Sequence, residues 1–153
     1  MNVTTGQLLP EFTAASTGGE FSPAALKGRK LVLYFYPKDD TPGCTTESTD
    51  FRDRVAAFDA AGATIVGVSR DSLRSHEGFR TRHALPFDLV SDPDEQLCEL
   101  FGVMKMKNMY GRQVRGIERS TFVIDADGRL VREWRGVKVP GHADEVLEYV
   151  RSL

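Results

Sequence analysis

The chemistry of this 153-residue sequence centres on its two cysteines, Cys44 and Cys98. Cys44 follows a Pro-Gly turn, after an apolar run ends and before a helical pattern begins. Free N–H groups and the dipole at a helix N-terminus favour negative charge, so a cysteine at this position tends toward the nucleophilic thiolate. Thr41 lies three residues earlier, close enough in a tight turn to hydrogen-bond the sulfur or an oxygen of a bound substrate. The sequence therefore predicts a reactive, partly sheltered thiol at Cys44.

Two other interpretations of Cys44 are weaker. A free cysteine beside a turn is often a small, inert, buried residue. A disulfide oxidoreductase normally uses a Cys-x-x-Cys pair, and Glu47 stands at the second position here.

A specific resemblance favours reactivity. Pro37, Thr41 and Cys44 match the P-x-x-x-T-x-x-C active-site motif of peroxiredoxins, and the segment TPGCTTES resembles the bacterioferritin comigratory, or Q-type, subfamily. The likeness covers nearly the whole chain, and it continues through residues 51–53, 89–92, 101–103, 109–111 and 116–122.

This resemblance implies a thiol-dependent peroxidase that reduces hydrogen peroxide or organic hydroperoxides through a Cys44 sulfenic acid, without a metal or an organic cofactor. It also assigns Arg119 as the distant arginine that stabilises the thiolate and orients the peroxide, which suits a permanently charged guanidinium. Glu47 matches a position that holds this arginine, although a carboxylate in a first helical turn is also favoured by the dipole alone. A redox sensor that uses Cys44 oxidation only to change partners is the non-enzymatic alternative.

The regeneration of Cys44 is the open question. Many subfamily members carry a resolving cysteine five residues after the reactive one, where this sequence has Thr49. Cys98 shares a helical face with Leu97 and Phe101, a pattern typical of a packed residue. We therefore expect reduction by an external thiol, namely thioredoxin, glutaredoxin or a low-molecular-weight thiol, and Cys98 remains the alternative resolving residue.

The elements around Cys44 alternate between strands and helices. A buried strand is expected at 30–36, a helix at 45–60, a strand at 63–69, a helix at 72–83, a strand at 87–90 and a helix capped by Asp92-Pro93 that ends at Gly102. Residues 11–21 predict a small N-terminal hairpin, 120–134 a second hairpin and 143–150 a closing helix. Residues 104–118 are interpreted as a basic, Met-rich loop. The pattern indicates an α/β fold, and the resemblance specifies a thioredoxin-like mixed sheet flanked by helices in one domain, 1–153.

The bulk properties of the chain and the spacing of its histidines argue against several other functions. A net charge of −2 gives no reason to expect nucleic acid, and no apolar run is long enough to span a bilayer. A cytoplasmic location is the default expectation, and the resemblance implies a monomer or weak homodimer. His76, His83 and His142 lack metal-site spacing and are expected on solvent-facing helix positions. The segment 125–128 is expected to be a turn rather than a calcium loop.

Overall fold

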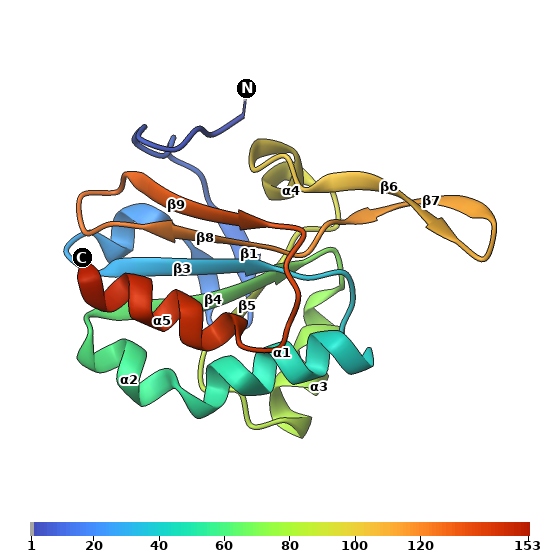
Figure 1. Ribbon diagram of the computed structural model, residues 1–153, viewed down its shortest axis with the longest axis horizontal. Helices are drawn as coiled ribbons and strands as arrows, with labels where there is room; N and C mark the ends of the chain where they lie inside the picture. Colours follow the sequence, from blue (N-terminus) through green and yellow to red (C-terminus); the bar gives the residue numbers. More distant parts are fainter. Residues whose placement is uncertain (1) are drawn as a thin grey trace.

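The computed structural model describes residues 2–153 and shows a mixed β-sheet with helices on both faces (Figure 1). Met1, the first residue of the expected domain, lies outside the described residues. The strands are β1 (Ala14–Ser16), β2 (Gly19–Phe21), β3 (Lys30–Phe35), β4 (Ala63–Ser69), β5 (Asp88–Ser91), β6 (Met104–Met109), β7 (Arg112–Ile117), β8 (Ser120–Ile124) and β9 (Leu130–Arg135). The α-helices are α1 (Pro42–Asp53), α2 (Val55–Ala60), α3 (Leu73–Arg82), α4 (Gln96–Leu100) and α5 (His142–Ser152), and a short 3-10 turn, η1, covers Pro23–Leu26.

Seven strands form the main sheet in the order β2-β1-β5-β4-β3-β8-β9. β3, β4 and β5 run parallel, whereas β8 and β9 on one side and β1 and β2 on the other pair antiparallel. The predicted N-terminal hairpin is confirmed as β1–β2, and the predicted α/β class with a mixed sheet is confirmed as well. β3 is central because its side chains are apolar on both faces, as expected for a strand covered from both sides.

The sheet separates two hydrophobic cores. Alternate residues of β3 point to opposite faces, so Tyr34 belongs to one core and Phe35 to the other. Helices α1, α2, α3 and α5 cover the first face, and α4 lies on the second (Figure 1). Cys44 packs in the first core and Cys98 in the second, so the sheet stands between the two thiols.

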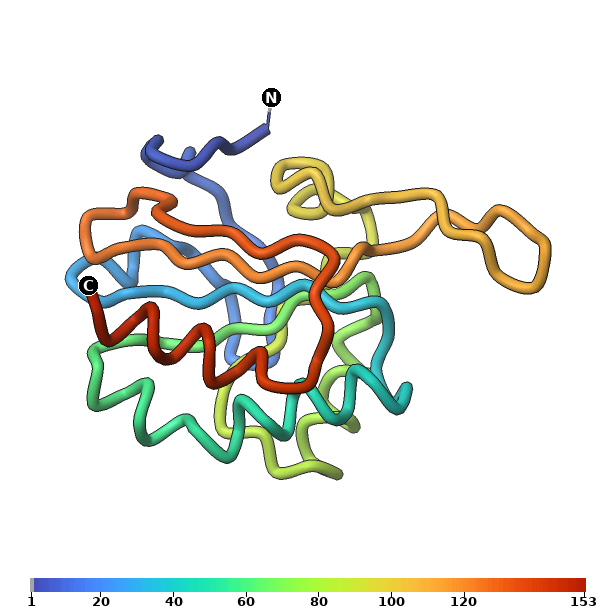
Figure 2. The backbone as a smooth tube through the Cα atoms, in the orientation of Figure 1, coloured from blue at the N-terminus to red at the C-terminus, as the bar shows by residue number. Residues whose placement is uncertain are grey.

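Three expectations about the elements are corrected. Residues 104–118 are not a loop: β6 and β7 pair antiparallel from Met104 opposite Ile117 to Met109 opposite Arg112, and this hairpin projects from the body (Figure 2). The expected helix 45–60 starts earlier and is two helices, because the chain leaves helical geometry at Arg54 with φ −113° and ψ 6°. The expected helix after Asp92 begins only at Gln96, although Asp92 does accept hydrogen bonds from the backbone N–H groups of Leu97 and Cys98.

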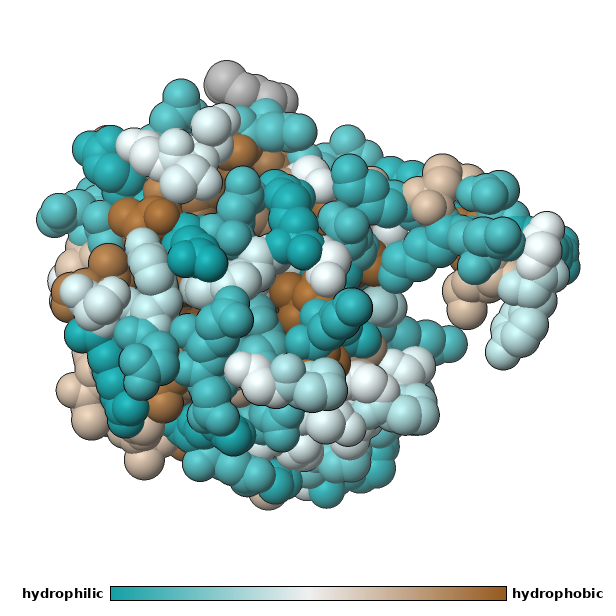
Figure 3. Space-filling model, viewed as in Figure 1, coloured by the Kyte–Doolittle hydropathy of each residue, from teal (hydrophilic) through white to brown (hydrophobic). Residues whose placement is uncertain are grey.

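None of the described helices has the length and apolar composition needed to cross a membrane. The visible surface is mainly hydrophilic, with small apolar patches rather than one continuous band (Figure 3).

Candidate active site

Cys44 occupies the first turn of α1, where the central strand β3 ends and the chain turns back. Thr41 is the N-cap residue with extended backbone geometry (φ −82°, ψ 151°), and Pro42 stands at the first helical position, where proline is favoured. The first N–H groups of a helix have no intrahelical acceptor, so those of Gly43 and Cys44 remain available for a developing negative charge. The residue Cys44 is 1 % exposed, so its thiol is more enclosed than the partly sheltered position that the sequence predicts.

Arg119 comes from the segment between β7 and β8 and joins Cys44 to Glu47. Its Nη2 donates to the sulfur of Cys44 at 3.5 Å, and its Nη1 donates to Oε1 of Glu47 at 2.7 Å. The fixed fork of the guanidinium therefore spans two acceptors on one face of α1, which an ammonium cannot do in the same geometry. The Arg119 side chain is 17 % exposed and Glu47 only 2 %, so the arginine is the part of this group that meets solvent.

Burial and charge act against each other on this ion pair. Burial raises the pKa of Glu47 to about 7, and the Arg119 guanidinium opposes that rise. Burial acts to lower the pKa of Arg119, but Glu47 and Cys44 together raise it, so the guanidinium stays charged. A positive charge held 3.5 Å from the sulfur stabilises negative charge on the sulfur or on an oxygen beside it.

Thr41 and Pro37 shape the loop that enters α1. The Thr41 hydroxyl donates to the carbonyl oxygen of Lys38 at 2.8 Å, so in this state its hydrogen is held by the loop and not by the sulfur. The lone pairs and the rotor of a hydroxyl still allow it to meet a substrate oxygen. Pro37 is half-buried and lies two residues after the end of β3.

Sequence reasoning missed two residues of this group. A Cβ added to Gly43 would lie 3.2 Å from Nη2 of Arg119, so the glycine permits the guanidinium to approach the sulfur. Lys107, on β6, is a second cation near the site: burial and then Arg119 lower its pKa, whereas Cys44 raises it. Gly43 carried no signal beyond its place in a Pro-Gly turn, and Lys107 was hidden in a segment interpreted as a solvated loop.

Cys98 is separate from this group. Its residue is fully buried on α4, and burial followed by interaction with Asp92 raises the pKa of its thiol well above the usual range. A thiol with a raised pKa supplies little thiolate, so it is a poor nucleophile toward a peroxide or a sulfenic acid.

The predicted solvent exposure of the histidines is wrong for two of them. His76 is fully buried, with Nδ1 2.8 Å from Asp39, and His142 is 6 % exposed, with Nε2 2.8 Å from the hydroxyl of Thr121. His83 is half-buried and lies 3.5 Å from Asp40. The partners of these rings come from other parts of the chain, which helical spacing does not reveal.

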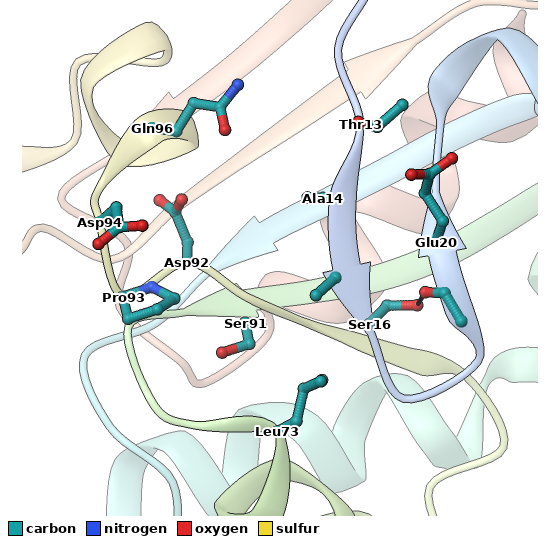
Figure 4. A pocket seen from close by; sticks show the side chains of 12 residues that line it. Thr13, Ala14, Ser16, Glu20, Leu73, Ser91, Asp92, Pro93, Asp94 and Gln96 are labelled. Atoms are coloured by element: carbon teal, nitrogen blue, oxygen red, sulfur yellow. Dashed lines mark hydrogen bonds between the residues drawn. The ribbon is translucent and has the colours of Figure 1, made fainter.

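A surface pocket of about 540 Å³ lies elsewhere, between the β1–β2 hairpin and the start of α4 (Figure 4). Asp92, Asp94 and Gln96 form one wall, and Ser16 and Glu20 face them (Figure 4). Its lining includes neither thiol and no arginine, so the pocket belongs to a different part of the surface from Cys44.

Comparison with known proteins agrees with the fold and the motif. Residues 5–133 match the AhpC/TSA family. The chain is 55 % identical to peroxiredoxin Bcp of Xanthomonas campestris over 137 residues, which cover 90 % of this chain and 86 % of that protein. It is 46 % identical to peroxiredoxin Bcp of Bacillus subtilis over 154 residues, which cover 100 % and 98 %.

Solved structures lead to the same group. A cysteine-to-serine mutant of Xylella fastidiosa PrxQ superposes with a TM-score of 0.93 at 43 % identity, covering 99 % of this chain and 98 % of that one. A structure of Xanthomonas campestris peroxiredoxin Q has a TM-score of 0.87 at 53 % identity and covers 92 % and 90 %. The chain therefore belongs to the AhpC/TSA family and is a peroxiredoxin, an enzyme of the thiol peroxidase class. Within that class its relatives are those of the bacterioferritin comigratory, or Q-type, subfamily, as the motif at Cys44 indicated.

Proposed function

We propose that Cys44 is the nucleophile of this thiol peroxidase and that an external thiol regenerates it. The observation that carries the proposal is the Glu47–Arg119–Cys44 arrangement, in which Arg119 lies 3.5 Å from the sulfur and is held by Glu47 at 2.7 Å. Thr41 and the N–H groups of the first turn of α1 complete the set of donors around the reacting oxygens. We assign the whole range 1–153 to one catalytic domain.

The reaction needs no group from outside the chain except the peroxide and the thiol. The Cys44 thiolate attacks the terminal oxygen of R–O–O–H; an S–O bond forms, the O–O bond breaks, and R–O⁻ leaves and takes up a proton. Arg119 and the donors of the α1 turn stabilise the negative charge as it moves from sulfur to the leaving oxygen. The product is a sulfenic acid, which two external thiols reduce to the Cys44 thiol, releasing water and their own disulfide.

Hydrogen peroxide and organic hydroperoxides are the substrates we propose. The Xanthomonas campestris bacterioferritin comigratory protein, whose structure is 52 % identical to this chain, is studied for its alkyl peroxide reduction activity. Thioredoxin, glutaredoxin or a low-molecular-weight thiol is the proposed reductant, acting in the cytoplasm on a monomer or weak homodimer.

The position of Cys98 favours the external route. A disulfide requires the two Cα atoms to come within roughly 7 Å, and the two thiols here pack in cores on opposite faces of the sheet. A Cys44–Cys98 bond would therefore need α4 or α1 to leave its core. Thr49, at the position where the family resemblance expects a resolving thiol in many members, donates its hydroxyl hydrogen to carbonyl oxygens of its own helix instead.

Matched single-thiol variants test this proposal. Peroxide consumption is measured with an excess of dithiothreitol and, separately, of a thioredoxin system, for the wild type, Cys44→Ser and Cys98→Ser. We expect Cys44→Ser to lose activity with both reductants and Cys98→Ser to keep it. Loss of turnover in Cys98→Ser, with a Cys44–Cys98 disulfide in the wild type, would favour the two-cysteine alternative, and slow turnover by the wild type with ample thiol would favour a sensor.

A further inference from the structure

A buried polar cluster fastens the loop 37–41, which leads into α1, to helix α3. Asp39 is 5 % exposed and His76 is fully buried. Nδ1 of His76 lies 2.8 Å from Oδ2 of Asp39, and Nε2 lies 2.9 Å from the carbonyl oxygen of Val90. Neither side chain has a part in the chemistry described above, yet Asp39 is only five residues from Cys44.

The hydrogen-bond partners fix how many protons this pair holds. The Val90 carbonyl can only accept, so Nε2 carries a hydrogen. Oδ1 of Asp39 accepts from the Tyr36 hydroxyl at 2.6 Å and Oδ2 accepts from the Ser75 hydroxyl at 2.8 Å, so one further proton must lie between Oδ2 and Nδ1. Burial acts to raise the pKa of Asp39, but the hydrogen bonds from His76, Tyr36 and Ser75 together lower it. The pair is therefore net neutral, and its central hydrogen bond depends on His76.

The same cluster holds the loop backbone as well as its side chain. The N–H of Asp39 donates to Oδ2 of Asp71 at 3.0 Å, and the Ser69 hydroxyl, at the end of β4, donates to the same oxygen at 2.5 Å. The next residue, Asp40, has a φ of 62°, and its carboxylate pairs with Arg82 at the far end of α3. α3 thus contacts the loop from both of its ends, immediately before Thr41 caps α1.

Asp39, Asp71 and His76 also place three metal-binding atoms within 4.8 Å of one another. Their facing atoms are bonded to one another and to Ser69, Ser75 and the Asp39 amide, however. The arrangement is that of a closed hydrogen-bond network, which serves to hold the loop.

We propose that His76 is a positioning residue for peroxide reduction, which acts through Asp39 to fix the loop 37–41 and so the placement of Thr41 and Cys44 against Arg119. This inference rests on the proposed role of Cys44. A displacement of the reacting groups by about 1 Å can lower the rate by as much as 100-fold. Fixing the loop 37–41 can therefore affect the rate of Cys44 oxidation even though His76 contacts no substrate.

Two substitutions at His76 separate positioning from packing. The amide of asparagine can place a donor where Nδ1 lies and so can still bond Asp39, whereas the longer glutamine reaches the place of Nε2 and bonds Val90 instead. Ser72→Ala is the matched stability control, because Ser72 caps α3 by accepting from the Ser75 N–H at 3.1 Å and does not bond Asp39. Loss of such a cap costs about 1 kcal/mol of stability.

The readout is the second-order rate constant for oxidation of reduced Cys44 by hydrogen peroxide, followed by rapid quench and mass spectrometry, with the melting temperature of each variant. We expect His76→Gln to react at least about 10-fold more slowly than the wild type, His76→Asn to stay within about 3-fold, and Ser72→Ala to be unchanged in rate despite its lower stability. Equal rates in His76→Gln and the wild type, or losses in all three variants that follow their melting temperatures, would overturn the proposal.

Ser75→Ala covers the case in which His76→Gln fails to fold, because it removes another hydrogen bond that α3 makes to Asp39. A rate loss in Ser75→Ala at unchanged melting temperature supports the proposal, and a wild-type rate contradicts it. A wild type that fails to form Cys44 sulfenate at all would instead refute the proposed function, so the two failures are distinguishable.

Discussion

At the scale of single residues, the site depends on the two hydrogen bonds that the Arg119 guanidinium donates. Arg119 donates to Cys44 and to Glu47 at once, so its position relative to the sulfur is fixed by a buried carboxylate three residues along α1. Gly43 leaves the space for this contact. The first turn of α1 thus combines the charge of Arg119, the carboxylate that orients it and a glycine that leaves room for it.

Substitution of Arg119 is expected to slow the chemical step. Arg119→Gln removes the charge beside the sulfur, and loss of one such donor typically lowers a rate by about 100-fold or more. Arg119→Lys keeps a charge but cannot bond both Cys44 and Glu47, so we expect only partial recovery. Single-turnover oxidation by hydrogen peroxide measures both, and Arg112→Lys on the exposed hairpin is the control that should match the wild type. Full activity in Arg119→Lys would show that the fork is unnecessary.

At the scale of elements, the local sequence predicted the parts whose pattern is self-contained. The apolar run of β3 and the Pro-Gly turn before Cys44 were sufficient to place the thiol at a helix mouth. The family resemblance assigned Arg119, which no local pattern could have joined to Cys44, 75 positions earlier in the chain. His76 was misjudged for the same reason, because its partner Asp39 is 37 residues away in a loop.

The β6–β7 hairpin was missed for a different reason. β6 starts with alternating Met and Lys residues, but β7 shows no such alternation, and both faces of the hairpin are largely exposed towards its tip, so the segment as a whole lacks the pattern of a half-buried strand pair. Its turn residues, Tyr110 and Gly111, both have positive φ, at 54° and 78°, but tyrosine is not a residue that signals such a turn. The two halves of residues 104–117 are recognised as strands only because β6 and β7 pair with each other.

Helix α5 introduces a pH dependence through His142. Burial is the main cause that lowers its pKa from 6.5 to about 4, so the unfolded chain binds this proton more readily than the folded chain between those values. The free energy of unfolding should therefore fall as the pH decreases, by about 2 kcal/mol between pH 7 and pH 4.5 from this group alone.

Urea denaturation of the wild type and His142→Gln at these two pH values isolates this contribution, because other groups, such as Asp39 and Asp144, titrate in both proteins. We expect His142→Gln to be less stable at pH 7, because its packing against Phe51 and Trp134 is reduced, but to lose less stability on acidification. The same loss in both proteins would contradict the assignment. His83→Gln, at a half-buried position, is the control.

At the scale of the whole molecule, the base of the β6–β7 hairpin is expected to contribute more to the free energy of unfolding than its exposed tip. Ile117, at the base of β7, is fully buried in the second core, whereas Met109, at the end of β6, is 49 % exposed. Ile117→Ala should reduce the free energy of unfolding by about 2–5 kcal/mol. Met109→Ala should change it by less than about 0.5 kcal/mol. Urea denaturation compares the two, and an equally costly Met109→Ala would mean that the tip packs against the body.

The central sheet also separates the thiols of Cys44 and Cys98. Cys44 and Cys98 lie in different cores, so we predict that Cys98 does not resolve a sulfenic acid at Cys44 in the native fold. We therefore expect the enzyme to depend on a thiol from outside the chain to complete its cycle.

The most direct test treats the reduced protein with about one equivalent of hydrogen peroxide in the presence of a sulfenic-acid trap and maps both cysteines by mass spectrometry, with Cys98→Ser in parallel. We predict rapid labelling at Cys44 in both proteins, with Cys98 of the wild type left as a free thiol. Slow or absent labelling at Cys44 in Cys98→Ser, or a Cys44–Cys98 disulfide in the wild type, would contradict the account.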